Sequence, residues 1–235
     1  MKKASGEIAR ANSRTIPSRA LSPQSLCLAA EHLAKVDPHL AELLKQEGPP
    51  PLWGRRPGFA TLIKIILEQQ VSLSSAASRY RWLKQNVAPF NPARFVELGE
   101  GHLRSLGVTR QKAGYCVQLS RSILNRDLDL RGLRKMDDLE ARAELMRLKG
   151  IGTWSADIYL LMALRRPDIW PSGDVALITA VTKIKQLPAR PDAEELLRIA
   201  EAWRPFRAVA ARMLWQHYLN HRLRRVKLDA KRGDV

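Results

Sequence analysis

The chain contains few of the residues that build disulfide frameworks or metal clusters. Only two of its 235 residues are cysteines, Cys27 and Cys116, and both lie among apolar neighbours. Two cysteines supply neither a disulfide scaffold nor a four-cysteine iron–sulfur cluster, so we expect small core residues at both positions. Among the five histidines only His217 and His221 have i, i+4 spacing, and no carboxylate accompanies them there. The sequence therefore predicts no bound metal.

Long apolar runs are also absent. No segment approaches the roughly 20 apolar residues of a membrane-spanning helix. The N-terminus is charged and has no apolar centre of the kind that marks a signal peptide. These absences argue against a membrane protein and favour an intracellular one.

Acidic residues are scarce beside basic ones: 23 Asp and Glu stand against 40 Lys and Arg, which gives a formal net charge of +17. A charge this far from zero favours a polyanionic partner, and nucleic acid is the first to consider. The two ends, residues 1–23 and 227–235, are basic and lack hydrophobic periodicity. We predict a flexible arm and a tail there, on either side of a folded domain at residues 24–226.

Strand-like alternation is nearly absent, whereas helical periodicity runs through most of the chain. In GFATLIKIILEQQ the apolar residues follow the i, i+3, i+4, i+7 rule of an amphipathic helix, predicted over residues 58–69. Further predicted helices lie at 25–36, 72–87, 109–125, 137–148, 153–165, 193–203 and 206–226. Segments rich in proline and glycine separate them. The sequence therefore predicts an all-α fold.

A pair of glycines interrupts the helical pattern beyond the middle of the chain. The predicted helix 137–148 opens with the capping-box sequence DDLE, and the next helix begins at Thr153. Between them Gly150 and Gly152 flank Ile151, which allows a tight turn with an apolar plug. Without β-carbons at the glycines, the amides of the turn and of the new helix can approach a phosphate, aided by the helix dipole. The alternative is an ordinary turn between two helices, which the hairpin alone does not exclude.

The hairpin is the start of a longer pattern. The segment LKGIGTWSADIYLLMALRRPDIWPSGDVAL (148–177) resembles the helix-hairpin-helix DNA glycosylase superfamily, in which a hairpin, a helix and a proline-containing loop lead to an aspartate. Further segments are similar to its 3-methyladenine DNA glycosylase II branch: ILEQQVSLSSAA (66–77), LRSLGVTRQKAGYCVQLSRSIL (103–124) and WRPFRAVAARMLWQHYL (203–219). The resemblance spans residues 55–222 and implies a two-lobed glycosylase fold with DNA in the cleft between the lobes.

The resemblance also implies an activity, the excision of alkylated bases of the 3-methyladenine and 7-methylguanine type from damaged double-stranded DNA in base-excision repair. A monomer is expected. Bifunctional members carry a lysine two residues after the second hairpin glycine, where this chain has Trp154, so a lyase reaction through a Schiff base is not expected. No cofactor is required. Relatives hold a monovalent cation at hairpin carbonyls, and the sequence leaves its presence here open.

Asp174 falls at the place of the family's aspartate. Breaking an N-glycosidic bond develops positive charge on the sugar, and a carboxylate facing the sugar can stabilise that charge and position water. An alkylated purine is already cationic and leaves as a neutral base, so one carboxylate suffices. The alternative is that Asp174 only caps the helix after Gly173, since aspartate is a favoured N-cap. The resemblance favours catalysis.

The target base must leave the stack before its glycosidic bond is accessible, and a cationic base binds well between aromatic rings. The candidates for this base pocket are Trp154, Trp170 and Trp215, with Tyr159 and Phe59 behind them. Aromatic residues at helical spacing are also typical of a core, so we expect only some of the five to line the pocket.

A side chain must also fill the gap that the flipped base leaves. By resemblance this wedge lies in EQQVS at Gln70, beside Gln69, whereas the alternative is that both glutamines cap helix 58–69. Arg110, Gln111 and Lys112 begin another predicted helix and are candidate phosphate contacts, although a solvated charged face has the same pattern. The predicted DNA-binding set comprises Gly150, Ile151, Gly152, Thr153, Gln69, Gln70, Arg110 and Lys112.

Two other functions remain open from the sequence. The same fold could excise deaminated purines or an oxidised base, because selectivity depends on the shape of the pocket. A non-catalytic DNA-binding module could keep the hairpin and the basic surface. Such a module has no use for a carboxylate that repels phosphate, so Asp174 favours the enzyme.

Overall fold

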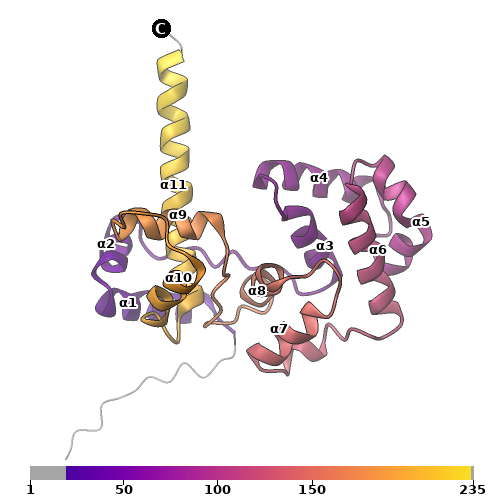
Figure 1. The fold of residues 1–235 in the computed structure, drawn as a ribbon, viewed down its shortest axis with the longest axis horizontal. Coiled ribbons are helices and arrows are strands. Elements are labelled where there is room, and N and C mark those ends of the chain that lie inside the picture. The colour runs from indigo at the N-terminus through magenta and orange to yellow at the C-terminus, as the bar shows by residue number, and fades with distance from the viewer. Residues whose placement is uncertain (1–19, 234–235) are drawn as a thin grey trace, which may run out of the picture.

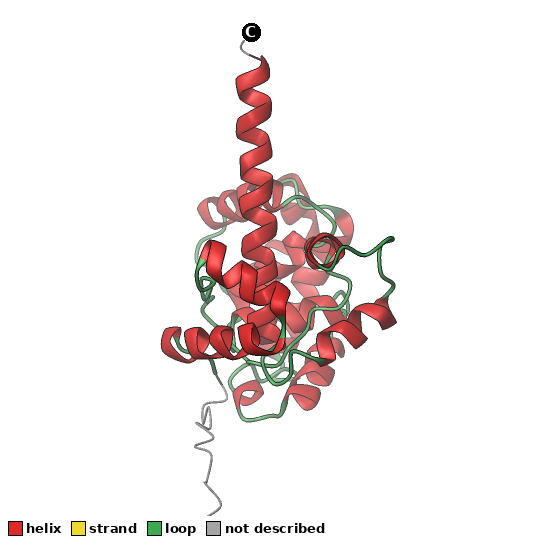
Figure 2. Cartoon of the chain, turned by 90° about the vertical axis from the view of Figure 1, so that its left-hand side faces the viewer, coloured by secondary structure: helices red, strands yellow, loops and turns green. Residues whose placement is uncertain are grey.

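The computed structural model describes residues 20–233, with side chains as far as Leu223. This part of the chain forms eleven α-helices and one 3-10 turn and contains no strand, which confirms the all-α prediction (Figure 2). The elements are α1 (Pro23–Val36), α2 (Pro38–Glu47), α3 (Phe59–Glu68), α4 (Leu73–Asn86), α5 (Pro92–Ser105), α6 (Arg110–Leu124), η1 (Gly132–Arg134), α7 (Asp138–Met146), α8 (Thr153–Met162), α9 (Val175–Ile184), α10 (Ala193–Glu201) and α11 (Arg207–Gly233). None of these described helices is both long and apolar enough to span a bilayer.

The helices form the two lobes that the resemblance implies (Figure 1). In one lobe α1 and α2 pack with α11, which also packs on α9, and α10 lies beside them. The other lobe holds α3 to α8, where α3 contacts α4, α6 and α8 and α5 packs on α6. The first lobe thus combines the beginning and the end of the described chain. This non-contiguous arrangement explains why the sequence shows no repeat of fixed period.

Helices α2, α5 and α9 lie outside the predicted set. Both α2 and α5 begin with a proline, Pro38 or Pro92, where the fixed φ suits a helix and the missing N–H removes no hydrogen bond. Asp37 and Asn91 cap these helices by accepting backbone N–H groups of the first turn. α5 also contains Gly99 at φ 67, which divides the helix and obscures its periodicity.

The structure describes little of the predicted arm and most of the predicted tail. Most of the predicted arm, residues 1–23, lies outside the described residues, and α1 begins at Pro23. α11 continues to Gly233, so most of the predicted tail at 227–235 is helical. The sequence has no proline or glycine between Arg207 and Arg232, and this permits the helix to continue.

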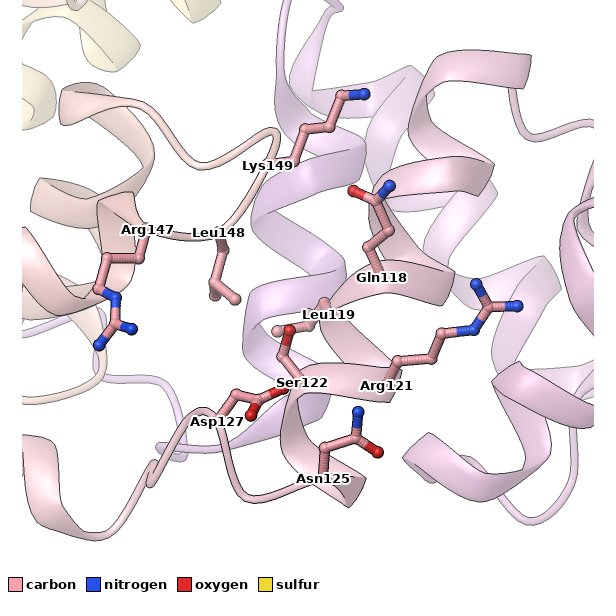
Figure 3. Close-up of a pocket in the computed structure, with 9 residues that line it drawn as sticks. All are labelled: Gln118, Leu119, Arg121, Ser122, Asn125, Asp127, Arg147, Leu148 and Lys149. Carbon is pink, nitrogen blue, oxygen red and sulfur yellow. The ribbon is translucent and has the colours of Figure 1, made fainter.

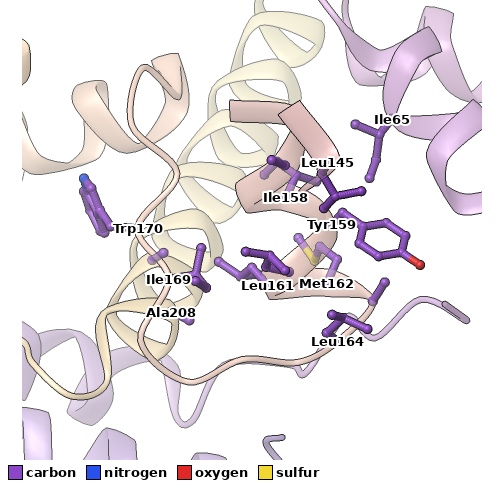
Figure 4. Packing of buried hydrophobic residues seen from close by; sticks show 14 of the residues in the cluster. Ile65, Leu145, Ile158, Tyr159, Leu161, Met162, Leu164, Ile169, Trp170 and Ala208 are labelled. Atoms are coloured by element: carbon purple, nitrogen blue, oxygen red, sulfur yellow. The ribbon is translucent and has the colours of Figure 1, made fainter. Parts of the chain in front are cut away.

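Helix α8 is the buried centre of the molecule. Every residue from Ser155 to Met162 is buried. Figure 4 shows its side chains packed among residues of α3, α7 and α11, in a cluster that includes Ile158, Tyr159, Leu161, Met162, Ile65, Leu145 and Ala208. Arg212 of α11, itself fully buried, donates to the Leu161 carbonyl at 2.8 Å, and burial lowers the pKa of Arg212 to about 10. α8 therefore joins the two lobes.

Candidate active site

Asp174 lies where the two lobes meet. It ends the proline-containing loop and is the N-cap of α9, because its Oδ1 accepts the Leu177 N–H at 3.0 Å. The same carboxylate accepts two indole N–H groups, from Trp154 of α8 at 3.0 Å and from Trp215 of α11 at 3.1 Å. One indole comes from each lobe. The capping role that was the alternative to catalysis is present, and the indoles add a second set of contacts that capping does not require.

The charge of the Asp174 carboxylate is not neutralised. Its described partners are one backbone N–H and the two indoles, all of them uncharged. The side chain is half-buried, Trp154 is also half-buried and Trp215 is 8% exposed. Neutral donors orient a carboxylate without cancelling its negative charge, so the group can stabilise a cation that forms beside it.

The hairpin has the predicted geometry around Ile151. That side chain is only 4% exposed and is packed into the core between α7 and α8, as expected for the apolar plug. Asp137 and Glu140 form the predicted capping box at the start of α7. Lower in the hairpin, Arg142 of α7 donates to Asp157 of α8 at 2.6 Å. Burial raises the pKa of Asp157 to about 6 against the opposing effect of Arg142. These contacts fix the angle between the two helices.

The two hairpin glycines have different reasons to be glycine. Gly150 has φ +89, and a β-carbon there would overlap the ring of Tyr115 from α6. Gly152 has an ordinary φ of −89 and open space where a β-carbon would lie. It is exposed and caps α8 without a side-chain hydrogen bond, and Thr153 after it is also exposed. The backbone N–H groups in the first turn of α8 are therefore accessible to an anion.

The turn between α3 and α4 separates the roles of its two glutamines. Gln69 is half-buried, and its amide donates to the Gly150 carbonyl at 2.7 Å and to Ser155 Oγ at 2.9 Å. Gln70 is exposed at φ 55, a conformation that side chains other than glycine rarely adopt. The predicted wedge therefore lies on the surface, while its neighbour is held inside the fold.

The predicted phosphate contacts of α6 also separate. Arg110 is exposed at the start of the helix. Lys112 instead donates to the carbonyls of Leu67 at 2.9 Å and Gln69 at 2.7 Å, and burial lowers the pKa of its ammonium. We therefore correct its assignment from phosphate binding to capping the C-terminal end of α3, where carbonyls lack helical partners.

Three of the five predicted pocket aromatics are core residues. Tyr159 is fully buried, its hydroxyl accepts the Gly58 N–H at 3.0 Å, and burial raises its pKa to about 12. Trp170 is 3% exposed and packs on Trp203 with ring centroids 5.4 Å apart. Phe59 packs edge-on against Phe95. We correct these three assignments from pocket to core, and only Trp154 and Trp215 lie at Asp174.

A basic hollow adjoins the hairpin. It has a volume of about 300 Å³ and lies between the second half of α6 and the end of α7 (Figure 3). Its basic lining residues are Arg121, Arg147 and Lys149, against a single acid, Asp127. Lys149 directly precedes Gly150, so this side of the hairpin carries positive charge that suits a phosphate backbone.

The sequence did not reveal Ser155 or the partner of His217. Ser155 is 3% exposed and is polar on a largely apolar helix, which is a signal that it has a buried partner. Glu47 of α2 comes within 2.8 Å of His217 Nδ1 and also accepts the Asn220 amide at 2.9 Å. This carboxylate was not expected near the histidine pair. The described residues nevertheless contain no group of three or more acidic, histidine or cysteine side chains placed to hold a metal ion.

A family model described as the HhH-GPD superfamily of base excision DNA repair proteins matches residues 63–205. The chain belongs to this superfamily. The matched region runs from α3 through the hairpin and Asp174 to the residues just before α11, so it contains the arrangement described above. The resemblance noted in the sequence is thereby confirmed.

Three relatives in the HhH-GPD superfamily are 22–27% identical to this chain. YfjP of Bacillus subtilis is 27% identical over 197 residues, which covers 79% of this chain and 67% of YfjP. The DNA-3-methyladenine glycosylase of the same organism is 27% identical over 67% of this chain, and the chain spans only 56% of its length. The solved structure of Schizosaccharomyces pombe Mag1, a 3-methyladenine DNA glycosylase in complex with abasic DNA, is 22% identical with a TM-score of 0.68. That match covers 80% of this chain and 95% of Mag1, and shows a shared fold.

Proposed function

We propose that this chain is a monofunctional DNA glycosylase that excises alkylated bases of the 3-methyladenine and 7-methylguanine type in base-excision repair. It acts as an intracellular monomer on damaged double-stranded DNA. The observation that carries the proposal is the carboxylate of Asp174, held by two indoles at the junction of the lobes with no cation beside it in the described structure. The names of the relatives, several of which are 3-methyladenine glycosylases, agree with it.

The proposed chemistry uses the negative charge of the Asp174 carboxylate. When the bond between the sugar and a flipped base breaks, positive charge develops at the anomeric carbon. An uncompensated carboxylate lowers the energy of that charge and can accept a hydrogen bond from the attacking water. A base alkylated at N3 or N7 is already cationic and departs neutral, so the reaction needs no separate general acid. The proposed mechanism therefore uses one carboxylate and no cofactor.

Trp154 and Trp215 serve the same site in two ways. Their N–H groups hold the carboxylate. In the proposed complex their rings would lie beside the flipped nucleotide. An electron-rich indole attracts a cationic base by a cation–π interaction worth about 1–2 kcal/mol. This favours alkylated purines over their neutral parents. A monovalent cation at the hairpin carbonyls would assist backbone binding only.

The absence of lyase activity is part of the proposal. A lyase needs an amine that attacks the sugar, and the position that supplies it in bifunctional members holds Trp154, whose indole donates to Asp174. The ammonium of Lys112 already donates to the carbonyls of Leu67 and Gln69. The product should be an intact abasic strand, and reduction with borohydride should trap no protein–DNA adduct.

The test is base release from methylated duplex DNA by the wild type and by Asp174→Asn, with free 3-methyladenine and 7-methylguanine separated by chromatography. We expect release by the wild type and a loss of about 100-fold or more in the variant, with duplex binding retained. Release by the variant at the wild-type rate would overturn the catalytic assignment. If neither protein released a base while both bound duplex, DNA with deaminated or oxidised bases would be tested next, and failure there would leave a non-catalytic DNA-binding protein.

A further inference from the structure

One side chain fastens the α3–α4 turn to the hairpin. The Gln69 amide nitrogen donates to the Gly150 carbonyl at 2.7 Å and to Ser155 Oγ at 2.9 Å. Both of its N–H groups are therefore used. The turn and the hairpin are 81 residues apart in sequence, and they meet because α3 packs against α8.

Lys112 fastens the same turn from α6. Its ammonium donates to the last carbonyls of the turn's helix, those of Leu67 and Gln69, at 2.9 Å and 2.7 Å. α6 also packs on α3, so the lysine bridges two adjoining helices (Figure 1). Gln69 is thus held at both ends, by its carbonyl toward α6 and by its amide toward the hairpin.

The result is a fixed position for Gln70. This residue directly follows Gln69, is exposed, and has φ 55. A residue with a β-carbon rarely adopts this conformation and keeps it only where the surrounding structure determines it. Val71 beside it is also exposed, at 45%. Hydrogen bonds of the adjoining Gln69 therefore connect the tip formed by Gln70 and Val71 to the hairpin.

We propose that Gln69 and Lys112 are positioning residues that hold this tip at a set distance from the hairpin amides. The hairpin fixes one phosphate of the DNA, and the tip then enters the stack at the right depth to replace a flipped base. The inference rests on the proposed function and deepens it, because it assigns residues to the flipping step rather than to bond cleavage. Removing a base from the stack costs free energy, and a tip that is not held in place would offset less of that cost.

The test compares paired and mispaired lesions. Gln69→Met and Lys112→Met keep side-chain length and remove the donors, and Gln85→Met and Lys45→Met change exposed residues of the same types as controls. Single-turnover base release is measured on duplexes that carry one 7-methylguanine opposite cytosine or opposite adenine. We expect the Gln69 and Lys112 variants to lose about tenfold in rate on the paired lesion and markedly less on the mispaired one, because a mispaired base needs less energy to flip. Equal losses on both duplexes, or no loss on either, would overturn the proposal.

A second readout does not depend on chemistry. A duplex with a stable abasic analogue beside 2-aminopurine gains fluorescence when a protein side chain unstacks the probe. The wild type should raise this fluorescence at saturation, and both variants should raise it less, although they bind the duplex.

Ser155→Ala, which removes one acceptor of Gln69 with little change in volume, provides a milder variant if Gln69→Met does not fold. A wild-type response without base release would sink the proposed function and leave the tip assignment standing, whereas equal fluorescence in wild type and variants would sink the assignment alone.

Discussion

Two aspartates of the same lobe, Asp37 and Asp174, have nearly the same local structure. Asp37 is the N-cap of α2 and Asp174 is the N-cap of α9. Each also accepts an indole N–H through the carboxylate, Asp37 from Trp203 at 2.7 Å and Asp174 from Trp154 and Trp215. A helix cap and an indole partner therefore do not distinguish a structural carboxylate from the one that we propose to be catalytic.

The difference is a cation. Lys185 Nζ lies 2.6 Å from Oδ2 of Asp37, and Asp37 is only 4% exposed. Burial raises the pKa of Asp37, but the hydrogen bonds from Lys185 and Trp203 and the charge of Lys185 outweigh it, so the pKa is lowered overall. Asp174 is more exposed and has only neutral donors among the described residues. The negative charge of Asp37 is paired with Lys185 inside the protein, whereas the charge of Asp174 stays available to a ligand.

The first way to break this comparison is to remove both charges in turn. Asp37→Asn should lower the free energy of unfolding by about 2–3 kcal/mol, because its amide would face the Lys185 ammonium and leave it unpaired. Asp174→Asn should cost less than about 1 kcal/mol, since asparagine is also a good N-cap. Urea titration followed by circular dichroism measures both. Base release per folded molecule should survive in the Asp37 variant and be lost in the Asp174 variant. Equal destabilisation by the two substitutions would make Asp174 a structural residue.

The second way is to take the cation from Asp37. Lys185→Met should lower the free energy of unfolding near neutral pH by about 1–2 kcal/mol. The lowered pKa of Asp37 means that its contribution is complete above its ordinary value of 3.8 and is lost as pH falls through the folded pKa. In the variant that pKa rises, so the difference in melting temperature between the two proteins should shrink as the pH falls from about 6 to about 3. A difference that stays constant with pH would contradict the assignment.

How well the sequence predicts a feature of this molecule depends on how far apart along the chain the interacting residues lie. The helix at 58–69, the capping box at Asp137 and the plug at Ile151 are signals within one or two turns, and the structure agrees with each. The assignment of Asp174 rests on the family resemblance of the segment that leads to it, because spacing alone is equally typical of a helix cap. The partners that define its chemistry lie 20 and 41 residues away, and no local pattern indicates which indoles will meet there.

The assignments that failed share one cause. Lys112 has the pattern of a basic residue on a helix face. Its acceptors are backbone carbonyls at the end of another helix. Because every residue has a backbone carbonyl, no sequence pattern indicates which ones a lysine will contact. Tyr159, Trp170 and Phe59 are aromatic residues whose spacing fits a core and a pocket equally well. Whether such a residue lies in the core or in a pocket depends on how the two lobes pack around α8. Hydrophobic periodicity does not indicate this tertiary packing.

A third prediction concerns the indoles of Asp174. Trp154→Phe or Trp215→Phe removes one N–H donor and keeps an aromatic ring, so the carboxylate becomes less well oriented. We expect each variant to lose about tenfold in single-turnover base release, equivalent to one hydrogen bond of about 1.4 kcal/mol, with affinity for abasic duplex nearly unchanged. Trp203→Phe is the matched control at Asp37 and should lower stability without lowering the rate. A rate loss in the control as large as in the other two would show that the indoles act only through the fold.

The smallest expected effect comes from giving Asp174 a cation of its own. Val175 follows it at the start of α9 and is 60% exposed, so Val175→Lys can be accommodated without repacking and places an ammonium near the carboxylate. The added charge should slow base release about two- to fourfold at saturating protein, because it opposes the cation that forms on the sugar at a partly screened distance. Val175→Met controls for side-chain length. Since salt screens an exposed charge, the rate difference between the two variants should narrow as ionic strength rises. A lysine variant as fast as the methionine variant at low salt would mean that the neutral surroundings of Asp174 are not what separates it from Asp37.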